Sequence, residues 1–454
     1  MEKLHKINGM PAGFFLGKSA VQLVKDIKDH KNTAVQLTEI ALNEIERLNP
    51  ILNAFVAIDR EDAIQQAVVL DNLQQRGEPL GSLHGIPIAV KDLIFTKGLA
   101  TKAGSKYHIG DDKTLDAQCI KQLRAAGAVI IGKTLTHEFA YGPTGDRSAQ
   151  GASLNPWDLT CITGGSSAGS ACAVAAGMVP LAIGTDTGGS IRIPSALCGV
   201  LGFKPSAHVV STDGVYPLAS TFDHVGPIAN NIADICVAFE VLKVSQVSKP
   251  LNNQGKKVAW IDPKTFGQID KAIAEQVYNY AEQLSGSMLD ATQTMASILQ
   301  EVQQCYFPIQ SAEAASVHIH RINTEPQVFD KEVLERLQDA AHIKGWEYIT
   351  ALEKLDKLIV AALECFEQYD FIMMPTVGIT APKLQQRDIV INNQADKVRD
   401  SLLRLTNPWN ALGFPAITVP IGTYQGLPIG LQIIAKLGAD NLLLNFVTQL
   451  FKNN

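Results

Sequence analysis

The chain has 454 residues, a formal net charge of −6 and 46% hydrophobic residues. This length exceeds that of most single domains, although large α/β enzymes reach it. Because the charge balance is acidic and no block of basic residues occurs, direct nucleic-acid binding is not expected. Seven cysteines without a CxxC pair predict neither a zinc site nor a disulfide framework, and reduced thiols favour a cytoplasmic protein.

Two parts of the chain bear on membrane association. The opening residues, MEKLHKINGMPAGFF, contain no apolar region of the signal-peptide type. Residues 159–185 carry no charge, but five glycines and Pro180 interrupt them. Since a spanning helix needs about 20 predominantly apolar residues, we expect no membrane segment.

The N-terminal part of the chain is predicted to be helical. Apolar residues recur at helical spacing from Ser19 to Leu48, with a cap at Asn32–Thr33 and an end at Asn49–Pro50. A second amphipathic pattern, at residues 60–75, predicts another helix that stops before Gly77.

Further along the chain, short apolar segments alternate with helical patterns. Strands are predicted at 86–90, 128–131, 179–184, 371–374, 416–419 and 428–435, and helices at 115–126, 171–177, 439–451 and over most of 264–369. This order predicts an α/β fold: one large domain with a mixed β-sheet core flanked by helices, in which C-terminal strands rejoin the sheet begun by N-terminal ones. We divide the domain, residues 1–454, into N-terminal helices (19–76), a core (80–235), a helical insert (264–369), and C-terminal strands and helix (370–454).

Three segments could carry chemistry. In GIPIAVKD, residues 85–92, Lys91 ends an apolar strand. Burial would disfavour its charged form and make it a usable base. In TGGSSAGS, residues 163–170, glycines let hydroxyl and backbone N–H groups crowd a small space. Each pattern is also typical of ordinary structure, such as an exposed strand-end lysine or a turn that caps a helix.

The third segment is GTDTGGSIRIP, residues 184–194. Its two adjacent glycines allow a tight turn whose N–H groups could form an oxyanion cradle beside Ser190. Asp186 and Arg192 could pair and brace this turn, and with Ser167 they are the residues expected to support the site structurally.

Two other patterns are minor alternatives. Residues 127–134, GAVIIGKT, fit the Walker A expression, but their interior is strand-like, whereas a P-loop places the strand before the first glycine. Residues 165–169, GSSAG, fit the GxSxG elbow, with His208 and His224 as candidate triad partners. That motif needs a strand immediately before it, and none is predicted there.

Taken together, these segments resemble the amidase signature family. The resemblance covers most of the chain and includes GIPIAVKD, GAVIIGKTLTHEFAYG, NPWD, GGSSAGSACAVAAG, GTDTGGSIRIP, FIMMPT and NPWNALGFPAITVPIG. The spacings of 75 residues from Lys91 to Ser166 and 24 from Ser166 to Ser190 also match the family. One departure is Ala168, where the family usually has glycine.

The resemblance implies a set of catalytic residues. Ser190 matches the nucleophile, Ser166 the bridging serine after a cis peptide bond, and Lys91 the base. No metal and no organic cofactor is implied. The oxyanion hole is implied at the backbone N–H groups of Thr187, Gly188, Gly189 and Ser190.

The expected activity is cleavage of a carboxamide C–N bond through an acyl-enzyme, with release of ammonia or an amine. Three kinds of substrate stay open. EFAYG, VYPLASTFDHVGP and AEAASVHIHRINTEPQVFD are similar to carboxybiuret hydrolases of s-triazine degradation, which favours a small amide or ureide. Alternatives are the glutamine-hydrolysing A subunit of an aminoacyl-tRNA amidotransferase and a general aryl- or fatty-amidase, although no long apolar N-terminal anchor of the fatty-amidase type is present.

Residues of the substrate pocket are harder to predict. If the substrate is anionic, a cation should contact it, and the segment His318, His320 and Arg321 is the candidate. Tyr141 is a second candidate, on the loop after the GKT strand. A homodimer or a small accessory subunit is compatible with the sequence. A non-catalytic scaffold protein of a larger complex is the alternative from another functional class, but all three catalytic positions are intact.

Overall fold

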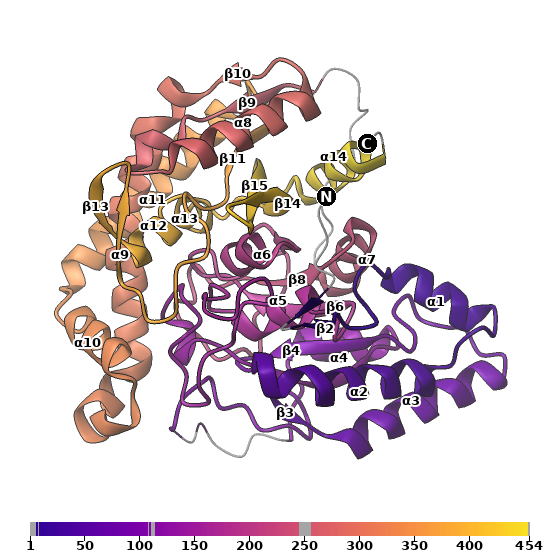
Figure 1. Ribbon diagram of the computed structural model, residues 1–454. Helices are drawn as coiled ribbons and strands as arrows, with labels where there is room; N and C mark the ends of the chain where they lie inside the picture. The colour runs from indigo at the N-terminus through magenta and orange to yellow at the C-terminus, as the bar shows by residue number, and fades with distance from the viewer. Residues whose placement is uncertain (1–5, 8, 108, 110–113, 245–255, 453–454) are drawn as a thin grey trace.

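A single mixed sheet forms the centre of the computed structural model, which describes residues 6–7, 9–107, 109, 114–244 and 256–452 (Figure 1). The sheet has eleven strands. In spatial order they are β10 (Leu289–Asp290), β9 (Val258–Trp260), β11 (Phe371–Pro375), β15 (Leu427–Ala435), β14 (Ala416–Tyr424), β7 (Leu201–Lys204), β8 (Val225–Ala229), β6 (Leu181–Thr185), β4 (Pro87–Lys91), β5 (Val129–Thr134) and β3 (Phe55–Ile58).

The strand order confirms the predicted α/β fold. β4 pairs in parallel with β5 and β6, and β11 pairs in parallel with β9. Between these parallel parts, every neighbouring pair of strands is antiparallel, in the order β6, β8, β7, β14, β15 and β11. Because β14 lies beside β7 and β15 lies between β14 and β11, the C-terminal strands rejoin the sheet that the N-terminal strands begin.

Helices surround the sheet, and two small hairpins lie outside it. The hairpins are β1 (Lys6–Ile7) with β2 (Met10–Pro11), and β12 (Asp388–Ile391) with β13 (Gln394–Lys397). Within the described part of the chain, no helix combines the length and the hydropathy that a membrane span requires. The helices are α1 (Ala20–Lys28), α2 (Ala34–Leu52), α3 (Arg60–Gln75), α4 (Gln118–Ala125), α5 (Ala168–Ala175), α6 (Arg192–Cys198), α7 (Ile232–Leu242), α8 (Lys271–Ser285), α9 (Thr292–Thr324), α10 (Lys331–Ala340), α11 (Gly345–Cys365), α12 (Val398–Leu403), α13 (Asn407–Ala411) and α14 (Asp440–Lys452).

Helix α2 begins as predicted but ends later. Thr33 caps it in a capping box with Gln36. The predicted end at Asn49–Pro50 was wrong, because the helix continues to Leu52 with Pro50 in its last turn. Leu52 is fully buried, and burying a leucine stabilises by about 1.5–3 kcal/mol. That gain is comparable to the cost of an interior proline, about 3 kcal/mol.

Helix α5 is buried on all sides. Every residue from Ala168 to Ala175 is buried, and all are small. A Cβ added at Gly169 would lie 2.1 Å from the carbonyl oxygen of Ala54, so this position requires glycine. The helix starts directly after Ser167, three residues before the predicted start at Ala171. Its close packing holds the serine-rich segment against the centre of the sheet.

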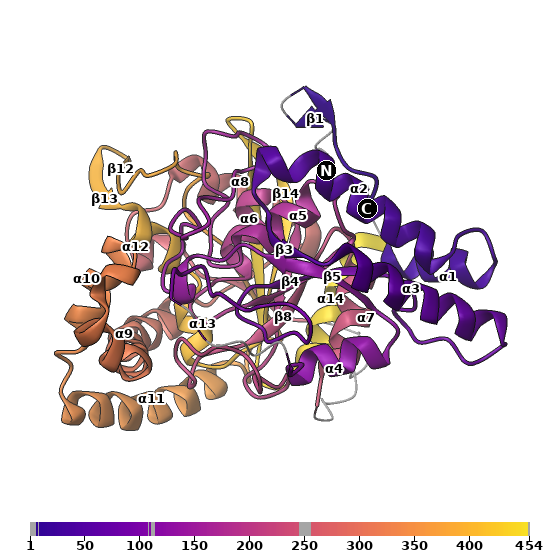
Figure 2. The same cartoon turned by 90° about the horizontal axis from the view of Figure 1, so that it is seen from below.

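The helical insert forms an arm along one side of the molecule. Helices α9, α10 and α11 lie together there, on the opposite side from α1, α2 and α3 (Figures 1 and 2). Tyr306 of α9 is buried and stacks on Phe222, with 5.1 Å between ring centroids. Its hydroxyl donates a hydrogen bond to the carbonyl of Thr187 at 3.1 Å. The arm therefore contacts the turn that follows β6.

Candidate active site

The end of β4 brings a buried lysine to a buried serine. Lys91 is fully buried, and its Nζ donates hydrogen bonds to Ser166 Oγ at 2.7 Å and to Thr185 Oγ1 at 2.6 Å. Burial lowers the pKa of Lys91 to about 7, although Asp186 and Asp223 oppose the shift. A substantial fraction of the amine is therefore neutral near pH 7 and available as a base.

The serine-rich loop places two serines between β4 and β6. The Gly165–Ser166 peptide bond is cis. Ser167 Oγ donates to the carbonyl of Thr185 at 3.1 Å, and Ser167 N–H donates to the carbonyl of Ser190 at 3.1 Å. Ser167 thereby ties the loop that carries Ser166 to the turn that carries Ser190.

The turn after β6 is built around the carboxylate of Asp186. This carboxylate accepts hydrogen bonds from the backbone N–H groups of Gly189 at 2.8 Å and Ile191 at 3.1 Å. Gly189 has φ of 134°, and a Cβ there would lie 2.3 Å from Thr406 Oγ1, so the turn requires glycine at this position. Ser190 follows, with 6% of its surface exposed.

The implied oxyanion donors differ in their hydrogen bonds. The N–H of Gly189 is engaged by Asp186. Those of Thr187, Gly188 and Ser190 donate to no other residue among those that the structure describes. On the other side of these peptides, Tyr306 and Thr406 donate to the carbonyls of Thr187 and Gly188. Three of the four predicted N–H groups therefore have no hydrogen-bond partner among the described residues, and the oxyanion hole stays a prediction.

An ion pair inside the protein braces the same turn. Asp186 and Arg192 are both fully buried, and Arg192 Nη2 lies 3.0 Å from Asp186 Oδ1. Arg192 Nη1 also donates to the Gln432 side chain at 2.6 Å and to the carbonyl of Thr406 at 3.0 Å. The charge and hydrogen bonds of Arg192 hold the pKa of Asp186 far below its usual range, although burial opposes this shift. The expected pairing of Asp186 with Arg192 is therefore present.

Replacing Arg192 with methionine is expected to destabilise the fold. Removing one partner of a buried pair leaves the other charge uncompensated, which costs about 3–5 kcal/mol. Urea unfolding of wild type and variant at pH 7 measures the difference. Lys397→Met is the matched control, because Lys397 pairs with Asp388 on the surface and its loss should leave the midpoint unchanged. Equal midpoints for Arg192→Met and wild type would contradict this prediction.

A small cavity adjoins Ser190. Its volume is about 20 Å³, which is room for roughly one water molecule. A wider cavity of about 370 Å³ shares Pro143, Arg336 and Arg399 with it. Its polar lining side chains are those of Tyr141, Ser190, Tyr306, Gln310, Arg336 and Arg399.

The structure brings one of the predicted substrate residues to this cavity and leaves others away from it. Tyr141 lines the cavity. His320 is exposed, and Arg321 instead stacks over Tyr107 at 4.0 Å and donates to the Tyr216 hydroxyl. His318 is buried against Phe139, with 4.3 Å between the rings. None of the three lines the cavity beside Ser190, because His318 and Arg321 pack into a neighbouring aromatic cluster and His320 is exposed.

Four polar side chains of the cavity were not predicted from the sequence. Tyr306 and Gln310 come from α9, Arg336 from α10 and Arg399 from α12. None of them belongs to a motif that signals chemistry, so the sequence contains no local signal for them. The packing of α9 and α10 of the helical insert, together with that of α12 from the C-terminal part, brings them together.

The two minor motif alternatives are not supported. Gly132, Lys133 and Thr134 belong to β5, and Lys133 Nζ is buried against Thr101 Oγ1 at 2.7 Å and Asp92 at 3.6 Å. The Walker A pattern is therefore strand rather than phosphate loop. Among the described residues, His224 shares hydrogen bonds with Phe222, Asp186 and Lys204 and with none of the serines of this pattern.

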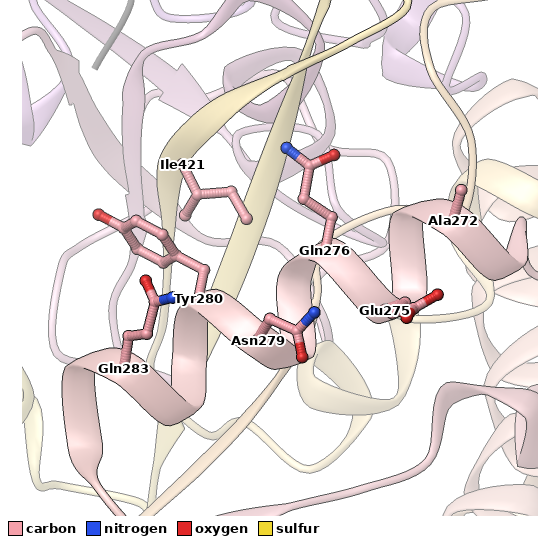
Figure 3. A pocket seen from close by; sticks show the side chains of 7 residues that line it. All are labelled: Ala272, Glu275, Gln276, Asn279, Tyr280, Gln283 and Ile421. Atoms are coloured by element: carbon pink, nitrogen blue, oxygen red, sulfur yellow. The ribbon is translucent and has the colours of Figure 1, made fainter.

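A separate depression lies on α8. Tyr280 and Gln276 of this helix face Ile421 of β14 there (Figure 3). It shares no lining residue with the cavity beside Ser190. Across the described residues, no group of three or more His, Cys, Asp or Glu side chains is arranged to hold a metal ion.

Two relatives of known name match this chain over most of its length. The A subunit of glutamyl-tRNA(Gln) amidotransferase from Symbiobacterium thermophilum is 34% identical, over 91% of this chain and 92% of that protein. The corresponding protein of the same name from Chlamydia pneumoniae is 33% identical, over 93% and 92%.

Solved structures are similar over nearly the whole chain. A crystal structure of an amidase has a TM-score of 0.89 at 29% identity and covers 96% of this chain and 99% of its own. An s-triazine catabolic enzyme, solved in a vestigial protein complex, has the same TM-score and identity, with 96% and 98% covered. The glutamyl-tRNA(Gln) amidotransferase protein from Thermotoga maritima has a TM-score of 0.76 at 31% identity, with 93% and 92% covered.

The fold and these similarities define a hydrolase that acts on carbon–nitrogen bonds. The chain belongs to the amidase family, whose model matches residues 36–444. The resemblance stated from the sequence motifs is thereby confirmed at the level of the family.

Proposed function

We propose that this chain hydrolyses a primary carboxamide through an acyl-enzyme on Ser190 and releases ammonia. The observation that carries the proposal is the buried hydrogen bond between Lys91 Nζ and Ser166 Oγ at 2.7 Å. It joins a base of lowered pKa to a hydroxyl on the loop tied to Ser190. The intact set of Lys91, Ser166 and Ser190 argues against a non-catalytic scaffold.

The reaction runs in two halves. Ser190 Oγ attacks the amide carbon while its proton passes through Ser166 to neutral Lys91. The free N–H groups of Thr187, Gly188 and Ser190 stabilise the oxyanion that forms, and each such donor contributes about 2.7–4 kcal/mol. The C–N bond then breaks as the proton returns through Ser166 to the leaving nitrogen. A water molecule then attacks the acyl-enzyme while its proton passes through Ser166 to Lys91. The return of this proton regenerates the Ser190 hydroxyl and releases the acid. No step requires a metal or an organic cofactor.

Glutamine is the first candidate substrate. The curated relatives that match this chain at 32–34% identity are named as the A subunit of glutamyl-tRNA(Gln) amidotransferase. They support the glutamine-hydrolysing alternative at least as well as the small-ureide function favoured by sequence segments. On this proposal the chain works in the cytoplasm with accessory subunits and does not bind nucleic acid directly.

A free-standing hydrolase of small ureides is the second candidate. The structural similarity to an s-triazine catabolic enzyme, at a TM-score of 0.89, exceeds that to the amidotransferase protein from Thermotoga maritima, at 0.76. The small volume beside Ser190 also suits a compact acyl group. Such an enzyme could be a homodimer or carry a small accessory subunit.

An ammonia-release assay separates the two candidates. Purified protein is incubated with glutamine, asparagine, biuret-type ureides and simple aryl and aliphatic amides. A kcat/KM at least about tenfold higher for glutamine than for the ureides favours the amidotransferase function, and the reverse order favours the ureide hydrolase. Silence toward every amide, alone and with the proteins that co-purify with the chain, would refute amide hydrolysis.

A further inference from the structure

The pairing of β6 with β8 continues past the ends of both strands and sets Thr187 opposite Asp223. Within the strands the pairing is antiparallel. One residue beyond their ends, the backbone N–H groups of Asp186 and His224 each donate to the carbonyl of the other, at 2.9 and 3.1 Å. The next step of this register brings a threonine hydroxyl and a carboxylate together as cross-strand neighbours, beside the turn that carries Ser190.

The Asp223 carboxylate accepts hydrogen bonds from three residues. Thr187 Oγ1 donates to its Oδ1 at 2.5 Å, and the N–H groups of Leu218 and Ala219 donate to its Oδ2 at 3.0 and 3.2 Å. No cation of the described chain forms an ion pair with it. Leu218 lines the same cavity as Ser190. The carboxylate therefore joins one wall of this cavity to the turn after β6.

The peptides of this turn are held from the side opposite to their N–H groups. The Thr187 side chain donates to Asp223, and the Thr187 carbonyl accepts from the Tyr306 hydroxyl at 3.1 Å. The Gly188 carbonyl accepts from the Thr406 hydroxyl at 2.6 Å. An oxyanion hole works through donors that are fixed before the reaction. The orientation of its N–H groups therefore depends on these partners, and Asp223 is the one among them that bears a charge.

The fold disfavours the ionised form of Asp223. Burial raises the pKa of Asp223 to about 6, although hydrogen bonds from Thr187, Leu218 and Ala219 oppose the shift, and the charge of Glu313 adds to it. Above that pH the charged carboxylate lowers the stability of the folded protein relative to a neutral side chain. A charge that weakens the fold beside a reactive serine indicates a role in the site.

The charged and titratable groups around Asp223 come from β4, α9 and the turn. Burial lowers the pKa of Lys91 to about 7, while the charges of Asp186 and Asp223 raise it. On α9, Glu313 repels the Asp223 charge. Tyr306 stays protonated, because burial raises the pKa of its phenol far above the usual range. Lys91 is thus the group of this set that Asp223 can stabilise as a cation.

We propose that Asp223 is a positioning residue of the reaction: its carboxylate fixes the Thr187 peptide of the oxyanion hole, and its charge stabilises the ammonium that forms on Lys91. Lys91 becomes positive when it takes the Ser190 proton, so a nearby negative charge favours that step, as a carboxylate does beside a histidine base. Asp223 does not line the cavity beside Ser190, so it acts through Thr187 and Lys91. The inference rests on the acyl-enzyme reaction proposed above and adds a residue to it.

The first test compares pH–rate profiles of wild type and Asp223→Asn on the amide that wild type hydrolyses best. Asparagine keeps the size of the side chain and removes its charge. At pH 8.5, where Lys91 is neutral, kcat should fall about 10- to 100-fold, because a misplacement of about 1 Å costs about 100-fold. KM should stay within about threefold, since an oxyanion donor acts in the transition state. The midpoint should move down by about half a pH unit or more, because a nearby negative charge favours the ammonium.

Two further variants show whether Asp223 acts through its partners. Thr187→Val removes the hydroxyl that donates to Asp223 and should lower kcat to a similar extent. Adding Asp223→Asn to it should cost less than the product of the two separate losses, because residues in contact are not additive. Glu313→Gln removes a negative charge from α9 and should not lower the midpoint, since Asp186 and Asp223 are the charges that act on Lys91. A midpoint that Asp223→Asn leaves unshifted, or a kcat within about twofold of wild type, would overturn the proposal.

Stability separates this role from a purely structural one. Because the fold disfavours the ionised carboxylate, Asp223→Asn should unfold at pH 8.5 at the same urea concentration as wild type, or at a higher one. A loss of activity together with a lower unfolding midpoint would mark Asp223 as a residue that only supports the fold, and the proposal would then be wrong.

A sulfonyl fluoride keeps the test independent of amide hydrolysis. With phenylmethanesulfonyl fluoride, the bond from Ser190 Oγ to sulfur forms as fluoride leaves, and the hydroxyl proton passes through Ser166 to Lys91. Mass spectrometry follows this labelling against pH in wild type and Asp223→Asn, with Ser190→Ala as the blank. A labelling midpoint that falls in Asp223→Asn, without any amide hydrolysis by wild type, would support the role of Asp223 and refute the proposed function. Amide hydrolysis with equal labelling midpoints in both proteins would support the function and refute the role of Asp223.

Discussion

Replacing Ser190 with alanine is expected to lower kcat for amide hydrolysis by about 10⁴- to 10⁶-fold, the scale of losses when a hydrolase nucleophile is removed. No acyl-enzyme can form without the hydroxyl, whereas substrate binding at the rest of the cavity persists. The Ser190 side chain makes no hydrogen bond to another described residue, so its loss should leave the fold intact. Single-turnover ammonia release measures the effect, and unfolding by urea checks the fold.

Ser167→Ala is the matched control for this experiment. Ser167 is the serine of the GxSxG pattern, but its hydroxyl binds the backbone at Thr185. Its loss should weaken the support of the loop and lower the rate by less than about 100-fold, the loss expected from a misplacement of about 1 Å. If Ser190→Ala kept more than about 1% of wild-type activity while Ser167→Ala lost all of it, the assignment of the nucleophile would be wrong.

The second large effect concerns Lys91 and pH. Burial lowers the pKa of Lys91 to about 7, and only the neutral amine can accept the Ser190 proton. Below pH 7 the amine is protonated, so kcat/KM should fall by about tenfold per pH unit there and level off above pH 8. Lys91→Met keeps the length of the side chain but removes the base, and it should lower kcat by about 10²- to 10⁴-fold.

Lys204→Met tests whether Lys91 is the group that titrates. Burial also lowers the pKa of Lys204 to about 7, but its Nζ donates to the carbonyl of Pro205 and lies 3.4 Å from His224, not at Ser166. The midpoint of the pH–rate profile should therefore survive in Lys204→Met and vanish from the residual activity of Lys91→Met. A midpoint near 7 that persists in Lys91→Met and disappears in Lys204→Met would exclude Lys91 as the base.

Local patterns in the sequence predicted the segments that carry Lys91, Ser166 and Ser190 and six of the eleven strands, β4, β5, β6, β11, β14 and β15. They did not predict β3, β7, β8, β9 and β10. An apolar run bounded by glycine or proline is enough to predict a buried strand. A glycine-rich turn that carries serines predicts a place where hydroxyl and backbone N–H groups lie close together. The strand predicted at 128–131 ends three residues later, because Lys133 is buried with Asp92. That pairing between distant segments cannot be inferred from a polar residue after an apolar run.

The substrate side of the site depends on the packing of the helical insert, which periodicity does not determine. Tyr306 and Gln310 lie one turn apart on α9 and both line the cavity. Arg321 lies eleven residues beyond Gln310 on the same helix, which is about 16 Å along its axis. Only the placement of α10 and α12 brings Arg336 and Arg399 to the cavity beside Ser190.

The hydrogen bond from Arg192 to Gln432 has a consequence for synthesis of the protein. The turn that carries Ser190 is braced by a residue of β15, the strand that lies between β11 and β14. A nascent chain on the ribosome, or one truncated before Leu427, leaves Arg192 without this acceptor and leaves the edges of β11 and β14 unpaired. Unpaired edges favour aggregation. A chain that lacks β15 is therefore expected to be inactive, so the ability to cleave an amide should arise only after synthesis has passed Ala435.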